Sequence, residues 1–253
     1  MFAEERLQEI IKILKLEGKL KVKDISTKFN VTEDCIRKDL KNLEKQGHLK
    51  RTYGGAVQIR ESAHEQDIVL RKEVNISTKT TIAKKAFQII ENRETIFLDI
   101  STTNIILAKL LSESTKNLTV VTNMPEIINI LSNKNNITVI CPGGVLNKNI
   151  GGFAGASTID FISRYKFDKT FIGSCGIDVF DRNITTFDIE DGITKKAIIQ
   201  SSKKNYIVME KHKFNYDGNY KFATLDDVNC IITDSIPTDE IKNIIEELNI
   251  ELI

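Results

Sequence analysis

The chain has 253 residues, of which 41% are hydrophobic, so it is long enough for a sizeable core and for two domains. Its net charge of +1 hides an asymmetry, because residues 1–60 hold 14 Lys and Arg against 9 Asp and Glu, whereas residues 61–253 hold the remaining 22 against 26. There is no apolar run of the roughly 18 residues that a membrane span needs, no signal peptide, and no metal-ligand spacing among the four cysteines and three histidines, so we expect a cytoplasmic protein without membrane contact, metal or other cofactor.

Two amphipathic helices open the chain. Apolar residues recur at helical spacing over 7–14 and again over 22–29, and the second helix ends at the Asn30-Val31 turn. A third helix with basic residues follows this turn directly. Two helices, a tight turn and a basic third helix are typical of a helix-turn-helix.

The third helix begins after Thr32, a residue type that caps helix N-termini, and ends at Gly47. Its apolar residues form one stripe that must face a core, so the opposite face is exposed. That exposed face carries four cations, namely Arg37, Lys38, Lys41 and Lys45. Such cations meet DNA phosphates and base edges, and the helix is therefore predicted to be the recognition helix.

A small hairpin is predicted after this helix, because residues 49–53 and 56–57 flank Gly54-Gly55. Arg51 in this wing is expected to lie along the DNA backbone. The alternative is an ordinary solvated, lysine-rich helix face, which is the commoner meaning of such a pattern. The order of helices, turn and wing favours DNA binding.

The same residues resemble the DNA-binding domain of the DeoR family of bacterial transcription regulators. Thr32 to Leu40 match the family's recognition-helix pattern, except that Cys35 stands where the family has Thr, and the tail Gly-x-Leu-x-Arg…Gly-Gly-Ala-Val runs from Gly47 to Val57. Residues 1–57 are thus expected to form a winged helix-turn-helix that binds double-stranded operator DNA. Its expected DNA-binding residues are Thr32, Arg37, Lys38, Lys41 and Arg51.

Residues 58–75 are polar and are predicted to be a linker, in part helical, between this domain and a second domain over 76–253. In the second domain helices alternate with short apolar, β-rich runs, which predicts a mostly parallel sheet with helices on both faces. The expected strands are 95–99, 118–122, 137–141, 169–172, 206–209 and 228–233, with a short terminal segment at 250–253. The expected helices are 77–91, 104–111, 125–131, 158–163, 189–202 and 239–248.

Ligands of such sheets bind beyond the carboxyl ends of the strands, so the residues after each strand are the candidates for a site. Hydroxyls, glycines and lysines recur there, and the hydroxyls at 101–103 stand where a strand turns into a helix, a place suited to an anion such as a phosphate. Ser and Thr also serve simply as helix caps, and glycines simply as turn residues. The candidate effector-binding residues are Asp99, Ser101, Thr102, Thr103, Asn123, Gly143, Gly144, Gly173, Gly176, Lys195 and Lys213.

This region resembles the sugar-sensing domain of the same family, a relative of the ribose-5-phosphate isomerase fold. The resemblance is carried by Leu-Asp-x-x-Thr-Thr (98–103), Val-Thr-Asn (121–123), Phe-Ile-Gly-x-x-Gly-Ile-Asp (171–178) and Thr-Thr-x-Asp-x-Glu (185–190) followed by Lys195. The chain departs from the pattern at Ile100-Ser101, where the family has Ser-Gly, and at 210–212, where Glu-Lys-His replaces Asp-Ser-Ser.

The expected function is a ligand-controlled transcription regulator: a repressor of a sugar or polyol utilisation operon, released from its operator by a phosphorylated sugar or polyol. One winged module contacts little DNA, so we expect a homodimer or homotetramer. The alternative is a sugar-phosphate isomerase with a DNA-binding domain, for which Asp99, Asp178, Glu210, Lys195 and Lys213 are candidates by type. A chromatin-like binder has no need of the second domain.

Overall fold

The structure, a computed structural model, describes residues 2–62 and 68–253. These residues form two compact units, 1–61 and 62–253, which are described separately below. The middle of the expected linker, residues 63–67, lies outside the described residues, and its last part forms the short helix α4 (Ile68–Glu73). Across the described ranges, no helix combines the length and apolar character needed to cross a bilayer.

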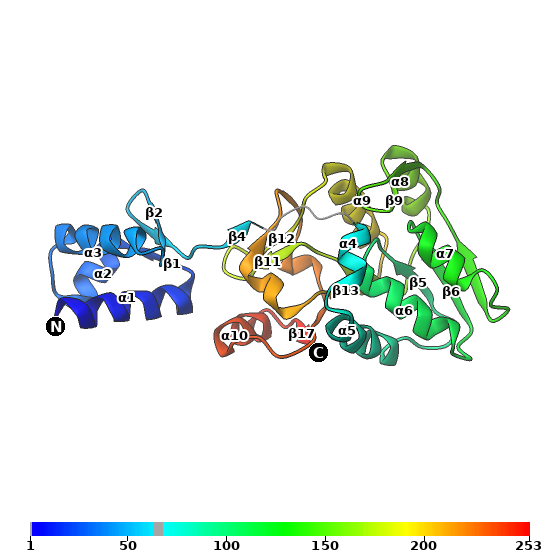
Figure 1. The fold of residues 1–253 in the computed structure, drawn as a ribbon, viewed down its shortest axis with the longest axis horizontal. Helices are drawn as coiled ribbons and strands as arrows, with labels where there is room; N and C mark the ends of the chain where they lie inside the picture. Colours follow the sequence, from blue (N-terminus) through cyan, green and yellow to red (C-terminus); the bar gives the residue numbers. More distant parts are fainter. Residues whose placement is uncertain (1, 63–67) are drawn as a thin grey trace. The chain divides into compact units, whose positions relative to one another are not determined.

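The first unit is the expected winged helix-turn-helix. Its elements are α1 (Ala3–Glu17), β1 (Lys19–Lys21), α2 (Val22–Phe29), α3 (Glu33–Lys45), β2 (Lys50–Thr52) and β3 (Gly55–Val57), with the two-residue β4 (Glu61–Ser62) at the unit boundary. The strands form one antiparallel sheet in the order β1-β3-β2, and Figure 1 shows this unit at the N-terminal end of the chain. Strand β1 was not expected from the sequence, because three residues are too few for alternation to mark a strand, and it is defined by its pairing with β3.

Local chemistry determines both ends of the recognition helix α3. The turn before it places Asn30 in the left-handed region at φ 53°, and the Thr32 hydroxyl accepts a hydrogen bond from the Cys35 amide at 3.3 Å. After the helix Gly47 has φ 77°, which permits the amide of His48 to reach the carbonyl of Leu43. The predicted bounds of this helix are therefore correct to within two residues.

A seven-stranded sheet forms the centre of the second unit, in the order β17-β16-β13-β10-β5-β6-β7, and every pairing in it is parallel. Its strands are β5 (Thr95–Leu98), β6 (Leu118–Thr122), β7 (Ile137–Ile140), β10 (Lys169–Gly173), β13 (Asn205–Val208), β16 (Cys230–Ile232) and β17 (Glu251–Leu252). This confirms the expected mostly parallel α/β sheet.

Helices cover both faces of this sheet (Figure 1). One face packs against α5 (Ile76–Gln88), α6 (Thr102–Ser112) and α7 (Pro125–Leu131), and the other against α8 (Ala156–Ser163), α9 (Ile189–Gln200) and α10 (Asp239–Glu247). Each face of the sheet has its own hydrophobic core. Neighbouring residues of β5 point into different cores, since Ile96 and Leu98 pack on the α5–α7 face and Phe97 packs on the α8–α10 face. This double burial explains why the strands are continuous apolar runs in the sequence.

Small antiparallel pieces complete the second unit, and the sequence analysis did not foresee them. They are β8 (Val145–Asn147) paired with β9 (Gly152–Ala154), and the sheet of β11 (Gly176–Asp178), β12 (Asn183–Thr186) and β15 (Tyr220–Thr224). Short segments η1 (Lys211–Asn215), β14 (Tyr216–Asp217) and η2 (Leu225–Asp227) join them. The strands are two to five residues long, which is too short for alternation to be distinguished from a turn.

Candidate functional site

The strand order of the sheet reverses between β5 and β10, because the chain runs outward from β5 through β6 to β7 and then returns to the other side of β5 at β10. In parallel α/β sheets such a reversal is where ligands bind. Asp99 follows β5 and Gly173 ends β10, and the Gly173 amide donates to Asp99 Oδ2 at 3.1 Å. A Cβ at Gly173 would come within 3.0 Å of the Ser101 Cβ, so the two strand ends approach closely.

A buried ionic cluster stands at this point, formed by Lys195 of α9 with Asp99 and Asp191. The Lys195 Nζ donates to Asp99 Oδ2 and lies 3.3 Å from Asp191 Oδ1, and Asp191 Oδ2 accepts from the Thr186 hydroxyl at 2.7 Å. The side chains of Lys195 and Asp99 are 3% and 0% exposed. Two carboxylates thus share one ammonium group away from water.

Burial dominates the electrostatics of this cluster. It raises the pKa of Asp99 to about 6, against the opposing attraction of Lys195 and with a further rise from Asp191. Burial also opposes the charge on Lys195, but the carboxylates of Asp191 and Asp99 outweigh it and raise the pKa of the ammonium. The cluster therefore keeps a charged lysine beside a carboxyl group that changes protonation in mildly acidic solution.

Hydroxyl groups line the beginning of α6, next to this cluster. The Ser101 hydroxyl caps the helix by accepting from the Thr103 amide at 3.2 Å, and Thr102 and Thr103 are buried in the first turn. Asn104 ties the turn to the sheet through donations from its Nδ2 to the carbonyls of Asp99 and Phe171, both at 2.8 Å. A strand-to-helix turn held in this way presents backbone amides and hydroxyls at a fixed place.

Several buried oxygens at this edge lack a hydrogen-bond partner among the described residues. They are Oδ1 of Asp99, Oδ1 of Asn104, Oδ1 of Asn123 and Oε1 of Glu210. Asn123 follows β6, and its Nδ2 donates to the carbonyl of Phe153 at 3.1 Å. Buried polar atoms in proteins are nearly always bonded, so these four acceptors mark a part of the sheet edge where the described residues supply too few donors.

The expected glycines divide into different roles. Gly144 has φ 127°, and a Cβ there would come within 2.3 Å of the Thr158 hydroxyl, which itself donates to the Gly143 carbonyl at 2.7 Å. Gly176 lies in β11, and a Cβ there would meet the carbonyl oxygen of Tyr216 at 1.8 Å. Gly144 and Gly176 thus have a packing reason to be glycine, while Gly173 lies in the ionic cluster itself.

Lys213 reaches the same edge from η1, where its Nζ donates to the Ser174 carbonyl at 2.8 Å. Of the three residues at 210–212 that depart from the family pattern, Lys211 and His212 are exposed and only Glu210 is buried. Arg71 and Lys79, which the sequence analysis missed, interact electrostatically with Lys213. Nothing in their local sequence marks them, since helices α4 and α5 carry many basic residues.

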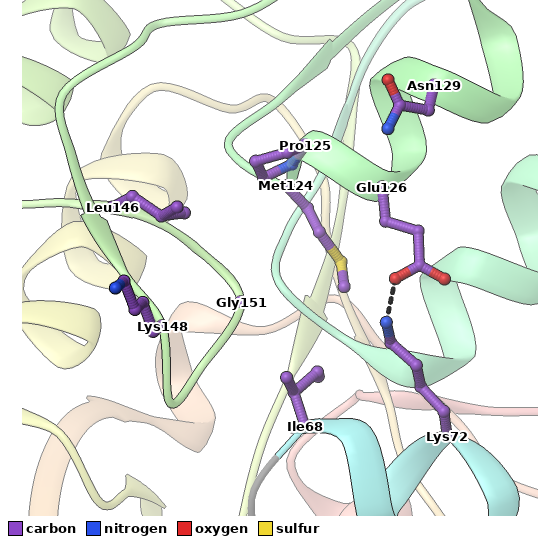
Figure 2. A pocket seen from close by; sticks show the side chains of 9 residues that line it. All are labelled: Ile68, Lys72, Met124, Pro125, Glu126, Asn129, Leu146, Lys148 and Gly151. Carbon is purple, nitrogen blue, oxygen red and sulfur yellow. Dashed lines mark hydrogen bonds and ion pairs between the residues drawn. The ribbon is translucent and has the colours of Figure 1, made fainter.

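A separate groove of about 620 Å³ lies beside α7 and the β8–β9 hairpin, and none of the expected effector residues lines it (Figure 2). Its apolar walls include Ile68, Met124 and Leu146, and its charged residues Lys72 and Glu126 form an ion pair with each other. Because Lys72 and Glu126 already neutralise each other, the groove has fewer unpaired polar groups for a ligand than the carboxyl edge around Asp99.

The expected DNA-binding residues all lie in the first unit, and they differ in the ion pairs and hydrogen bonds that they form. Lys38 and Lys41 are exposed on α3 and make no ion pair within the described part of the chain. Arg37 donates to Glu33 at 2.6 Å and to Asp34 at 2.8 Å. Arg51 of β2 is held near α3, since its amide donates to Glu44 at 2.8 Å.

One further residue of the wing was missed by the sequence analysis. Tyr53 stands at the turn between β2 and β3, and it is the most exposed large hydrophobic residue described, at 109% of its reference area. The neighbouring Gly54 has φ 81°, as the tight turn requires. A ring so exposed at the tip of the wing is accessible to any surface that the wing meets.

Comparison with known proteins agrees with this two-unit arrangement. Residues 6–62 match the family described as the DeoR-like helix-turn-helix domain, and residues 74–235 match the family described as the DeoR C terminal sensor domain. The uncharacterized HTH-type transcriptional regulator YulB of Bacillus subtilis (strain 168) is 35% identical over 238 residues, which cover 93% of this chain and 90% of that protein. The glycerol-3-phosphate regulon repressor of Escherichia coli (strain K12) is 31% identical over 248 residues, or 98% and 97% of the two chains.

Among solved structures, ribose 5-phosphate isomerase A from Methanocaldococcus jannaschii is similar to 55% of this chain and 54% of its own, with a TM-score of 0.41 and 12% identity. This likeness is too distant to carry a conclusion about function.

Proposed function

Because the chain belongs to the DeoR family of transcription regulators, we propose that it represses a sugar or polyol utilisation operon and leaves its operator DNA when a phosphorylated sugar or polyol binds the second unit. The observation that carries the proposal is the buried Asp99–Lys195–Asp191 cluster with unbonded acceptors around it, at the strand reversal of a sensor domain. The named repressor of a glycerol-3-phosphate regulon supports a phosphorylated, hydroxyl-bearing ligand.

Operator binding is assigned to α3 and the wing. Lys38 and Lys41 would face the major groove or its phosphates, with Thr32 and Arg37 nearest the helix start, and Arg51 would follow the backbone. Exposure of these side chains supports this role, since each is available without any rearrangement of the core. A single unit of this size contacts few base pairs, so we propose a homodimer or homotetramer that binds repeated half-sites.

Effector binding is assigned to the carboxyl edge of the sheet. The Asp99 cluster and Asn123 would take the hydroxyl groups of the ligand, because carboxylate and amide oxygens accept from hydroxyls. The first turn of α6, with Ser101, Thr102 and Thr103, would take the anionic end. Release then requires that the effector bind one arrangement of the protein better than another.

Family membership argues against the enzyme alternative. The matched families are a DNA-binding domain and a sensor domain, and the named relatives are regulators. An acid, a base and a lysine beside one another also occur where a ligand is only bound. The chain is therefore described as a regulator, and turnover is an outcome for experiment to exclude.

The test begins with thermal shift of the full chain against a panel of sugar phosphates and glycerol 3-phosphate. A binder at 100 times its Kd adds about 2.7 kcal/mol to stability. That compound should weaken binding to a DNA duplex selected by the protein itself from a random library. The same mixture should show no isomerised product by NMR after long incubation.

A double variant, Thr102→Val with Thr103→Val, should abolish the ligand response and leave DNA binding intact, because hydroxyls are lost at nearly constant volume. Thr138→Val is the control, since it removes an exposed hydroxyl from β7, the last strand of the same sheet. Release of DNA from the double variant at the wild-type ligand concentration would contradict the proposed site.

A further inference from the structure

Strand β8 of the β8–β9 hairpin exposes apolar side chains at an open edge. Val145 is 78% exposed and Leu146 is 47% exposed. Within the described part of the chain β8 pairs with β9 on one side only. Because alternate residues of an antiparallel strand bond to the neighbouring strand, the remaining backbone groups of β8 point to the open side.

Other edge strands of this protein carry charged residues. Lys50 and Arg51 lie in β2, Lys221 in β15 and Glu251 in β17, each at the edge of a different sheet. Charges at an edge oppose pairing with another chain. Strand β7 is an uncharged edge as well, but only one of its four residues is exposed. Strand β8, with the sequence Val-Leu-Asn, has neither a charge nor burial to protect it.

Two helices that contact the hairpin also expose apolar residues. The Asn149 carbonyl accepts from the Ile68 amide of α4 at 3.2 Å. On the other side Asn147 Nδ2 donates to Asp188, the residue before α9, also at 3.2 Å. Leu146 itself forms part of one wall of the groove in Figure 2. The exposed apolar residues of the two helices are Val69 and Leu70 in α4 and Ile189 and Ile193 in α9.

We propose that two copies of the chain meet through this hairpin, with β8 of one copy pairing antiparallel with β8 of the other about a two-fold axis at Leu146. The inference rests on the proposed function, which needs a homodimer or homotetramer, and adds to it the face through which copies meet. A two-fold axis places each strand opposite its own copy in the antiparallel sense, so the same three residues serve both sides of the contact.

Charges at the two ends of the hairpin fit this pairing. Glu190 lies near one end, because its Oε2 is 3.4 Å from the place that a Cβ on Gly155 would occupy. Continuing the register of β8 with β9 by one residue places Gly155 across from Gly144. Lys148 lies in the turn at the other end. Neither Lys148 nor Glu190 forms an ion pair with a described residue.

The two-fold pairing brings these opposite charges together. With Leu146 opposite Leu146, Lys148 of one copy comes opposite Gly144 of the other. It then lies two strand spacings, or about 10 Å, from Gly155 of that copy, within reach of the long Glu190 side chain. Because the axis is two-fold, the contact forms twice. This charge complementarity favours a second copy of the chain over an unrelated partner.

Cysteine cross-linking of the full chain tests the register. Directly opposite residues of antiparallel strands have Cα atoms about 4.5 to 5.5 Å apart, a separation that suits a disulfide. Leu146→Cys should therefore form a disulfide-linked dimer under mild oxidation. Val145→Cys is the matched control, since residue 145 lies opposite residue 147 and not opposite itself, and it should stay at the wild-type level. Equal cross-linking of the two variants, or none at Leu146→Cys, overturns the pairing.

Charge reversal tests the contact between the copies, measured by sedimentation over a range of concentrations. Lys148→Glu and Glu190→Lys should each weaken the dimer about tenfold, and the two changes together should restore it. Lys204→Glu is the control, since Lys204 is also exposed but precedes β13, and it should leave the dimer unchanged. A double reversal that associates as weakly as either single variant overturns the contact.

These results separate the inference from the proposed function. If the wild type associates but neither cross-linking nor charge reversal behaves as expected, the face is wrong and the repressor stands. If both behave as expected but no phosphate ester releases the selected DNA duplex, the interface stands and the proposed sensor fails. A wild type that is monomeric at every concentration overturns the interface together with the proposed homo-oligomer.

Discussion

Each unit of this protein buries an ionic cluster, and the two clusters are built differently. In the first unit Arg6 of α1 donates to both carboxylate oxygens of Asp39 on α3, at 2.5 and 3.2 Å, so one cation meets one anion with no oxygen left over. In the second unit one lysine faces two carboxylates, and Asp99 Oδ1 has no partner among the described residues. The first pair uses every oxygen of its carboxylate, whereas the second leaves one carboxylate oxygen without a partner among the described residues.

The difference teaches how to separate a structural ion pair from a binding group. A balanced, bidentate pair between two helices fixes their relative position, here that of the recognition helix against α1. An unbalanced cluster with an unbonded oxygen carries a desolvation cost that a bound donor would lower. The predictions below test this distinction, beginning with the largest expected effect.

Arg6→Met should destabilise the first unit by about 3–5 kcal/mol, because it leaves the Asp39 carboxylate buried without its cation. The double change Arg6→Met with Asp39→Leu should recover most of this loss. Amide hydrogen exchange in α1 and α3 of the full chain measures the effect without interference from the second unit. If the double variant is as unstable as Arg6→Met alone, the loss does not come from an unpaired Asp39 carboxylate and the prediction is wrong.

The second cluster should respond to pH in a way the first does not. Folded Asp99 has a pKa of about 6 against an ordinary value of 3.8, so between these values the folded state holds a proton that the unfolded state has lost. The wild type should therefore lose stability relative to Asp99→Asn as the pH rises from about 4 to about 6, by up to about 3 kcal/mol, with no further change above that window.

Urea unfolding followed by tyrosine fluorescence suits this measurement, because four of the five tyrosines belong to the second unit and the chain has no tryptophan. Asp99→Asn should also bind the effector poorly while folding well at neutral pH, a combination expected of a group kept for function. Parallel pH curves for wild type and variant would rule out Asp99 as the titrating group.

Exposed charges extend the comparison to the DNA surface. Lys38 makes no ion pair among the described residues and should contribute fully to binding, so Lys38→Gln is expected to weaken binding to the selected duplex about tenfold at fixed salt, or about 1.4 kcal/mol. Its melting temperature should not change, since the side chain touches no core. Unchanged DNA affinity would mean that α3 presents a different face to DNA.

The smallest effect is expected at Arg37, whose guanidinium must leave Glu33 and Asp34 before it meets DNA. Arg37→Gln should cost less than Lys38→Gln, and Glu33→Gln should strengthen DNA binding a few-fold by freeing the arginine. Binding titrations at two salt concentrations distinguish this from a general change in net charge. A stronger loss at Arg37 than at Lys38 would show that its surface pairs impose no constraint.

Much of the architecture could be predicted from local pattern. The bounds of α2, β6 and α7 are those expected, because each is a periodic apolar segment with a clear stop such as Asn30 or a clear start such as Pro125. The expected carboxyl-edge residues Asp99, Gly173 and Lys195 do meet, since the sheet is parallel as its buried runs indicated. Short antiparallel strands such as β11 and β12 were not predictable, because tertiary pairing alone makes them strands.

What the sequence by itself determined is therefore the order and type of the elements, since helix periodicity, caps and apolar runs act over a few residues. Only the tertiary structure decided which charges become partners. Asp99 and Lys195 are 96 positions apart, and they meet because the strand order reverses between β5 and β10 and α9 returns along that point. Arg71 had no role in the sequence analysis and Glu210 was a candidate there only by residue type, and it is burial in the fold that leaves an atom of each without a partner among the described residues. Desolvation depends on everything packed around a group, and that is a property of the fold rather than of any segment.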